Sequence, residues 1–256
     1  MMIQTFWRAA VVGGFLGLAA IAAPALAADE APKPLIEQGA LDALKKMTDT
    51  LKAANAIELS ITDFREVPSS QGQMVTLVTS AEITAERPNK FRAEANINGA
   101  ETSFVFDGKT FSALDKGKNL YVSAEIGADT MENFFKTLAE TRGIEFSVAD
   151  FLASDPYAIF SKGLTNAYDI GTTTIDGVTT QHLVFSAKGL EWQLWIDPAT
   201  NLPRLFSVIY NDVPREPRFL VNFKSWNLKA TPAAGTFTFT PPKDAASISF
   251  LPPGKS

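Results

Sequence analysis

Residues 190–210, LEWQLWIDPATNLPRLFSVIY, predict two β-strands joined by a turn. The first strand places three large apolar side chains on one face, but Trp195 lies on the other face among polar residues. The second strand alternates Phe206, Val208 and Tyr210 with residues that are also largely apolar. A half-buried antiparallel strand needs apolar side chains on one face only. The surplus predicts that a second layer or a cavity lies against this sheet.

Most of the remaining chain follows the same two-residue period. Residues 56–123 and 165–228 alternate apolar and polar side chains, with turns at Asn98-Gly99, Asp107-Gly108 and Lys116-Gly117. Asn-Gly and Asp-Gly are strong hairpin signals, because both turn positions require positive φ angles. The pattern predicts two antiparallel meanders.

Helices are predicted before and between the meanders. Residues 40–54 carry apolar side chains at three- and four-residue spacing, which is typical of an amphipathic helix. A second helix is expected from Met131 to Gly143. Ser147 to Asp150 resembles a capping box, and Asp155-Pro156 is a cap followed by proline at the first helical position. We therefore expect three helical segments in the middle of the chain.

This order of elements predicts the α+β class. We expect a strongly curved antiparallel sheet, or incomplete β-barrel, of about ten to eleven strands with helices packed against the concave side. The tail from Gly235 is expected to add one short strand before Pro241. No long linker divides the chain, so residues 35–256 are predicted to form a single domain after a mobile lead-in at residues 28–34.

The N-terminus has the features of a signal peptide. Arg8 precedes an apolar run at residues 9–23, and Ala25-Leu26-Ala27 is an A-x-A cleavage site. The run is shorter than the roughly 20 residues that a membrane-spanning helix needs. We therefore expect residues 1–27 to be removed by cleavage after Ala27, leaving an exported chain without stable membrane insertion.

Charge and cysteine content exclude several classes of function. The formal net charge is −5 at pH 7, whereas proteins that bind nucleic acid carry a basic patch. The chain has no cysteine, which excludes disulfides, zinc–thiolate sites and cysteine nucleophiles.

No catalytic motif is present in the sequence. The single histidine, His182, lies in a predicted strand without a partner histidine or cysteine, and no G-x-S-x-G motif occurs. Metal-binding signatures such as H-E-x-x-H are also missing. We therefore predict no catalytic residue, no metal site, no cofactor and no enzymatic activity.

Phenylalanine is the conspicuous residue type, with 19 copies against 4 tyrosines and 4 tryptophans. These rings can form an ordinary core, or some of them can line an apolar cavity for an acyl chain. The residues predicted to line such a cavity are Phe91, Phe104, Phe106, Phe134, Phe135, Leu138, Phe151, Phe160, Trp192, Leu194, Ile196, Phe206, Val208 and Tyr210.

Four stretches resemble a known superfamily: residues 87–94 (RPNKFRAE), 104–122 (FVFDGKTFSALDKGKNLYV), 190–210 and 237–245 (FTFTPPKDA). Together with the order of elements, they resemble the lipoprotein-localisation-factor superfamily of LolA/LolB-like proteins, and within it a group of predicted periplasmic proteins. The resemblance implies a periplasmic protein with an incomplete barrel, helices plugging its open side, and an apolar cavity. It also implies that the cavity accepts lipid chains of lipoproteins or senses envelope components.

Three functional hypotheses follow. The first is a periplasmic, non-enzymatic protein that binds a lipid, a lipoprotein acyl chain or another apolar ligand. The second is an envelope sensor or scaffold that contacts a protein partner. The third is a hydrolase acting on envelope lipid or glycan.

Overall fold

The computed structural model describes residues 34–250, so the predicted signal peptide, its cleavage site and all but the last residue of the lead-in lie outside the described residues. The helices are α1 (Gln38–Lys52), α2 (Met131–Arg142), α3 (Ala149–Leu152) and α4 (Pro156–Phe160). The strands before the helical middle are β1 (Ala56–Pro68), β2 (Met74–Glu86), β3 (Lys90–Ile97), β4 (Ala100–Phe106), β5 (Thr110–Asp115) and β6 (Leu120–Glu125). The strands after it are β7 (Leu164–Ile175), β8 (Val178–Ala187), β9 (Leu190–Asp197), β10 (Leu202–Ile209), β11 (Arg218–Asn227) and β12 (Ala246–Ser247).

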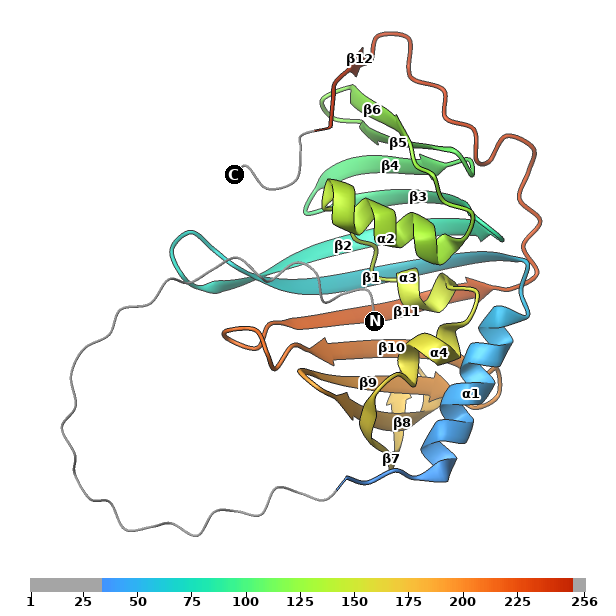
Figure 1. The fold of residues 1–256 in the computed structure, drawn as a ribbon, viewed down its shortest axis with the longest axis vertical. Coiled ribbons are helices and arrows are strands. Elements are labelled where there is room, and N and C mark those ends of the chain that lie inside the picture. Colours follow the sequence, from blue (N-terminus) through green and yellow to red (C-terminus); the bar gives the residue numbers. More distant parts are fainter. Residues whose placement is uncertain (1–33, 251–256) are drawn as a thin grey trace, which may run out of the picture.

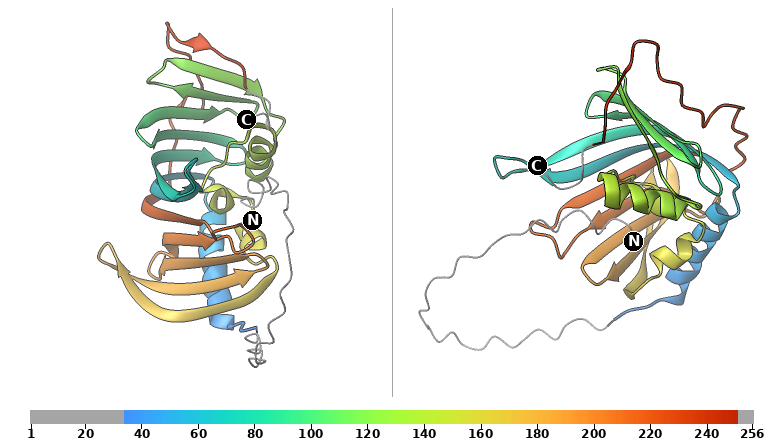
Figure 2. Two further views of the ribbon diagram at one scale, coloured as in Figure 1. Left: turned by 90° about the vertical axis from the view of Figure 1, so that its left-hand side faces the viewer. Right: turned by 45° about the horizontal axis from the view of Figure 1, so that its top comes forward.

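The strands form one sheet in the order β12-β6-β5-β4-β3-β2-β1-β11-β10-β9-β8-β7. The two meanders join because β1 pairs antiparallel with β11, and the two-residue β12 pairs parallel with β6. The sheet is strongly curled and its two edges do not meet (Figure 2). The predicted α+β class and the open, curved antiparallel sheet are confirmed.

Helices cover one side of this sheet (Figure 1), and local sequence explains their ends. Helix α2 begins at Thr130, whose side chain accepts a hydrogen bond from the Asn133 N–H, and ends at Gly143 with a φ of 68°. Helix α4 begins with the predicted Asp155-Pro156 cap, because Asp155 accepts a hydrogen bond from the Ala158 N–H. Helix α1 buries the predicted stripe of apolar residues.

Two local predictions are wrong. The expected capping box does not form, because the Ser147 hydroxyl donates to Asp63 Oδ2 at 2.9 Å and α3 begins without a side-chain cap. The tail forms turns after Gly235 instead of a strand, since the Thr238 N–H donates to the Gly235 carbonyl. The short strand of the tail comes later, as β12, after the prolines.

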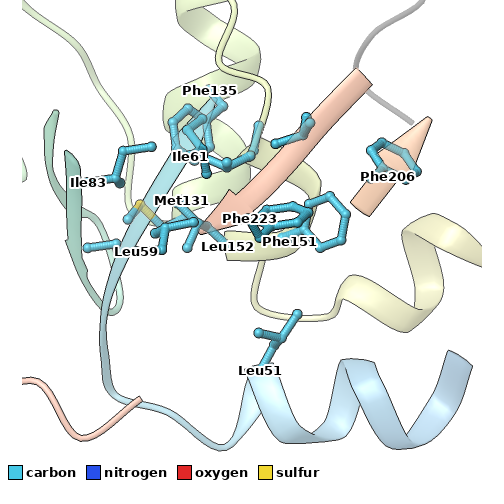
Figure 3. Packing of buried hydrophobic residues seen from close by; sticks show 14 of the residues in the cluster. Leu51, Leu59, Ile61, Ile83, Met131, Phe135, Phe151, Leu152, Phe206 and Phe223 are labelled. Carbon is cyan, nitrogen blue, oxygen red and sulfur yellow. The ribbon is translucent and has the colours of Figure 1, made fainter. Parts of the chain in front are cut away.

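The stretch at residues 190–210 forms β9, a turn and β10 as predicted. Its inward side chains pack against the helical layer: the Trp192 ring lies 5.4 Å from Phe160 of α4, and the Phe206 ring lies 5.1 Å from Phe151 of α3. Figure 3 shows Phe151 beside Phe223 of β11, with ring centroids 5.0 Å apart. On the opposite, convex face Trp195 stacks on His182 at 3.9 Å. The helices therefore cover the concave face, whereas the surplus apolar side chains, such as Trp195, lie half-buried on the convex face.

Candidate functional site

Aromatic rings fill two regions of the concave side. The first aromatic cluster lies between β3–β5 and α2 with the segment that follows it, and consists of Phe91, Phe104, Phe106, Phe111, Phe134, Phe135 and Phe146. The second aromatic cluster lies between β8–β11 and α3–α4, and consists of Phe151, Phe160, Phe185, Trp192, Phe206 and Phe223. Stacked pairs such as Phe106 with Phe134, at 4.0 Å, leave these regions well packed.

Beside the first cluster the concave side holds a pocket of about 340 Å³. Strands β1 to β4 form its floor, and residues 143–148, which connect α2 to α3, complete its wall. We call this the concave pocket. Its lining residues are Ile61, Asp63, Arg65, Leu77, Thr79, Ala81, Ile83, Ala93, Ala95, Ile97, Phe104, Gly143, Ile144, Glu145, Phe146, Ser147 and Val148.

Small side chains on neighbouring strands create the pocket. Ala81 of β2 and Ala95 of β3 are direct cross-strand partners, and Ala93 lies opposite Ile83. The side chains of these alanines point toward the concave side, as does that of Phe91 on β3, which fills the space below α2. An alanine methyl group cannot reach the covering segment, so a cavity remains above it.

Three charged side chains interrupt the apolar lining. Asp63 and Arg65 come from the inward phase of β1, and Glu145 comes from the segment between α2 and α3. Asp63 is only 7% exposed. Burial raises the pKa of Asp63, while hydrogen bonds from Ser147 and Thr79 and the charge of Arg65 act in the opposite direction. The carboxyl group of Asp63 is therefore held by partners within the protein.

Glu145 is less well satisfied than Asp63. Its side chain is 10% exposed, and Oε2 lies 3.7 Å from Nη1 of Arg65. Its Oε1 is buried and accepts no hydrogen bond from the described residues. Burial raises the pKa of Glu145 to about 7, with Arg65 lowering it and Asp150 raising it further. Glu145 therefore changes its charge close to neutral pH.

Two further ionisable groups interact electrostatically with Glu145. Asp150 of α3 is buried, and so is Tyr210, directly after β10. Burial raises the pKa of Tyr210, on which the charges of Arg65, Glu145 and Asp150 also act. The charged side chains on the concave side thus comprise three carboxyl groups and one guanidinium group.

All residues predicted to line a cavity are buried, none more than 9% exposed. Phe104 lines the concave pocket. Phe91, Phe106, Phe134 and Phe135 belong with it to the first cluster, and Leu138 of α2 is part of the surrounding core. Those on α3, α4, β9 and β10 belong to the second cluster or to the surrounding core. That they receive a ligand stays a prediction.

Sequence reasoning missed the charged residues of the pocket. Asp63 carries a signal, because it continues the inward phase of Ile57, Leu59 and Ile61 and so places a carboxyl group on a buried face. Glu145 lies in an irregular segment, where no periodicity marks it.

His182 lies away from the pocket, with its Nε2 2.8 Å from Gln193 Oε1. Among residues 34–250, no three histidine or acidic side chains are placed to hold a metal ion. In the same range, no helix is both long and apolar enough to cross a membrane.

The fold and pocket define a class: an open, curled antiparallel sheet with helices over its concave face and an apolar pocket beneath them. Residues 40–251 match the model of a family described as predicted periplasmic protein (DUF2092), and the chain belongs to this family. The predicted resemblance to periplasmic proteins is thereby confirmed. No curated protein matches the chain.

Several solved structures are similar to this chain at low sequence identity. The Mycobacterium tuberculosis lipoprotein LppX is 15% identical with a TM-score of 0.47, over 76% of this chain and 98% of LppX. LprF from Mycobacterium bovis is 15% identical with a TM-score of 0.45, over 83% of this chain and all of LprF (100%). The Pseudomonas aeruginosa MucA/MucB complex gives 12% identity and a TM-score of 0.38, over 79% of this chain and 61% of the matched chain.

Proposed function

We propose that this protein is a non-enzymatic periplasmic binding protein that takes an apolar ligand, such as an acyl chain of a lipid or lipoprotein, into the concave pocket. The observation that carries the proposal is the lining itself, which is apolar except for a few polar groups. Small-molecule sites are typically concave and apolar with a few polar groups that orient the ligand.

The size of the pocket limits the ligand. Its volume of about 340 Å³ lies near the lower end of the roughly 300–1,000 Å³ typical of ligand sites. We therefore propose a single medium-length chain or the end of a longer one. Each methylene group buried contributes about 0.8 kcal/mol, so ten of them contribute about 8 kcal/mol, which corresponds to micromolar affinity before the costs of association are subtracted.

The export part of the proposal rests on the sequence of residues 1–27 and on the description of the family. Sequencing the N-terminus of the protein from a periplasmic extract should begin at Ala28. A chain that retains Met1 and sediments with membranes would contradict export by cleavage.

The binding proposal is tested with a fluorescent decanoyl probe and a variant that fills the pocket. We expect micromolar binding to the wild-type chain, and at least a tenfold loss in Ala95→Phe, because the new ring occupies the space above the floor. The matched control is Ala199→Phe, which adds the same atoms at an exposed position in the β9–β10 turn. Equal binding by both folded variants would contradict this location, and no binding by the wild type would contradict the function.

A protein partner in the envelope is the second candidate, and one surface feature favours it. The β1–β2 hairpin extends beyond its neighbouring strands (Figure 1), and the cross-strand partners Phe64 and Val78 are 38% and 39% exposed on its convex face. If a partner binds there, Phe64→Ser should abolish its capture from envelope extracts and leave binding of the decanoyl probe unchanged.

A further inference from the structure

We infer that the concave pocket selects apolar ligands that end in a primary amine, and that Glu145 binds the ammonium group. The inference rests on the proposed function, since it names the class of ligand for the same pocket. It starts from a buried carboxylate oxygen that lacks a donor within a largely apolar site.

The two acids of the pocket differ in their hydrogen bonds. Asp63 accepts a hydrogen bond of 2.9 Å from the Ser147 hydroxyl, so the protein itself supplies its donor. Glu145 is nine-tenths buried, yet its Oε1 accepts no hydrogen bond from the described residues. Buried polar atoms in folded proteins are nearly always satisfied by a partner. A donor at Glu145 is therefore the group that the pocket lacks, and a ligand entering the pocket can supply it.

Arg65 does not fill this role. Its Nη1 is 3.7 Å from Oε2 of Glu145, which is an ion-pair distance beyond the range of a normal hydrogen bond. Its guanidinium group lies over the Phe219 ring at 5.5 Å, and its side chain is 37% exposed. Arg65 thus leaves Oε1 open and is partly screened by water.

The charge of the site favours a cation over an anion. The lining carries two carboxyl groups and one guanidinium group, and the negative charge of Asp150 raises the pKa of Glu145. A ligand carboxylate would add a further negative charge to this surplus. An ammonium group carries three N–H donors and a positive charge, so it matches both the missing donor and the surplus.

The arrangement makes amine binding dependent on pH. The charges that act on Glu145 are those of Arg65 from β1 and Asp150 from α3. Tyr210 after β10 also interacts with Glu145, and Asp63 from β1 lines the same pocket. The pKa of Glu145 is about 7, so its carboxylate form becomes dominant as pH rises above neutrality. Because the ammonium group binds the carboxylate form, amine affinity should rise from about pH 6 to about pH 8.

The test compares decylamine, 1-decanol and decanoate by isothermal titration calorimetry, below the concentrations at which they aggregate. We expect decylamine to bind at least tenfold more tightly than decanoate at pH 8, with decanol between them. Decyltrimethylammonium keeps the charge but has no N–H donor, and it should bind more weakly than decylamine.

Variants separate the role of Glu145 from that of the pocket. Glu145→Gln should reduce the preference for decylamine over decanoate about tenfold and remove its pH dependence. The control Glu140→Gln changes an exposed acid of α2 that lies 4.0 Å from Lys136, and it should behave like the wild type. Circular dichroism verifies that each variant is folded.

The failures of the two proposals can be told apart. If all three decyl compounds bind equally, or if Glu145→Gln keeps the full preference for the amine, this inference is overturned and the apolar binding function stands. If none of them binds the folded wild-type protein, the proposed function fails and the inference fails with it.

Discussion

The second aromatic cluster and the concave pocket lie on the same face of one sheet. Side chains fill the aromatic cluster but leave the concave pocket open. On β9 and β10 the inward positions carry Trp192 and Phe206, whose rings reach the rings of α3 and α4. On β2 and β3 inward positions carry Ala81 and Ala95, whose small side chains line the pocket below residues 143–148. The alternation of apolar and polar residues therefore determines which face of the sheet is buried, whereas the volume of the side chains determines whether that face encloses a ligand site.

The largest effect on stability should come from removing a ring from the second aromatic cluster. Phe206 is fully buried and contacts Phe151 and Phe160. Phe206→Ala should lower the free energy of unfolding by about 3–5 kcal/mol, because the densely packed surroundings cannot close around the lost ring. Urea unfolding followed by tryptophan fluorescence measures this change. A cost below about 1 kcal/mol would show that this region is as loosely packed as the pocket.

A smaller cost is expected for a ring at the edge of the open region. Phe146 lines the pocket, is only partly buried, and lies 5.2 Å from Phe104. Phe146→Ala should cost about 1–2 kcal/mol, since a partly exposed ring contributes less than the roughly 1.5–3 kcal/mol of full burial. The same variant should accept a longer acyl probe than the wild type. Unchanged chain-length preference in a binding assay would place the ligand elsewhere.

The pH dependence of stability should also distinguish the two regions. The pKa of Glu145 is raised from 4.5 to about 7, so the native state binds this proton more tightly than the unfolded chain does. The stability that results is complete below about pH 4.5 and is lost as pH rises through 7; the raised pKa of Asp63 acts in the same direction. Glu145→Gln should therefore lose less stability between about pH 5 and pH 8 than the wild type. Urea unfolding at both pH values provides the measurement, and identical losses would contradict the burial of an ionisable Glu145.

The smallest effect is expected on the convex face. His182 stacks on Trp195 and contacts Gln193, on the face of the sheet opposite to both regions of the concave side. His182→Gln should change ligand affinity by less than about threefold, because no group of the pocket depends on it. A hundredfold loss in a folded variant, measured with the decanoyl probe, would favour the enzyme hypothesis instead.

The sequence was sufficient to predict the sheet, because Trp192, Leu194 and Ile196 repeat with the two-residue period that a strand imposes. It also predicted the helix cap at Asp155, which depends on residues only three positions apart. The apparent cap at Ser147 failed because its hydroxyl bonds Asp63, 84 positions away in the chain. Local pattern cannot reveal such a contact.

The location of the pocket was beyond sequence reasoning for a similar reason. The many phenylalanines suggested an apolar cavity. When helices and strands bring such large rings together, however, the rings fill the space between them, as the stacked rings of Phe106 and Phe134 show. The pocket depends on Ala81 and Ala95 pairing across two strands and on residues 143–148 passing above them. None of these signals is visible within one segment.

The central claim is that an apolar ligand enters the concave pocket and leaves the second aromatic cluster closed. Hydrogen exchange with and without the decanoyl probe tests it most directly, since bound ligand slows local opening. We predict slower exchange at residues 143–148 and along β2 and β3, with α4, β9 and β10 unchanged. Slower exchange in α4, β9 and β10, with no change at residues 143–148, would show that the ligand opens the aromatic cluster and would contradict the account.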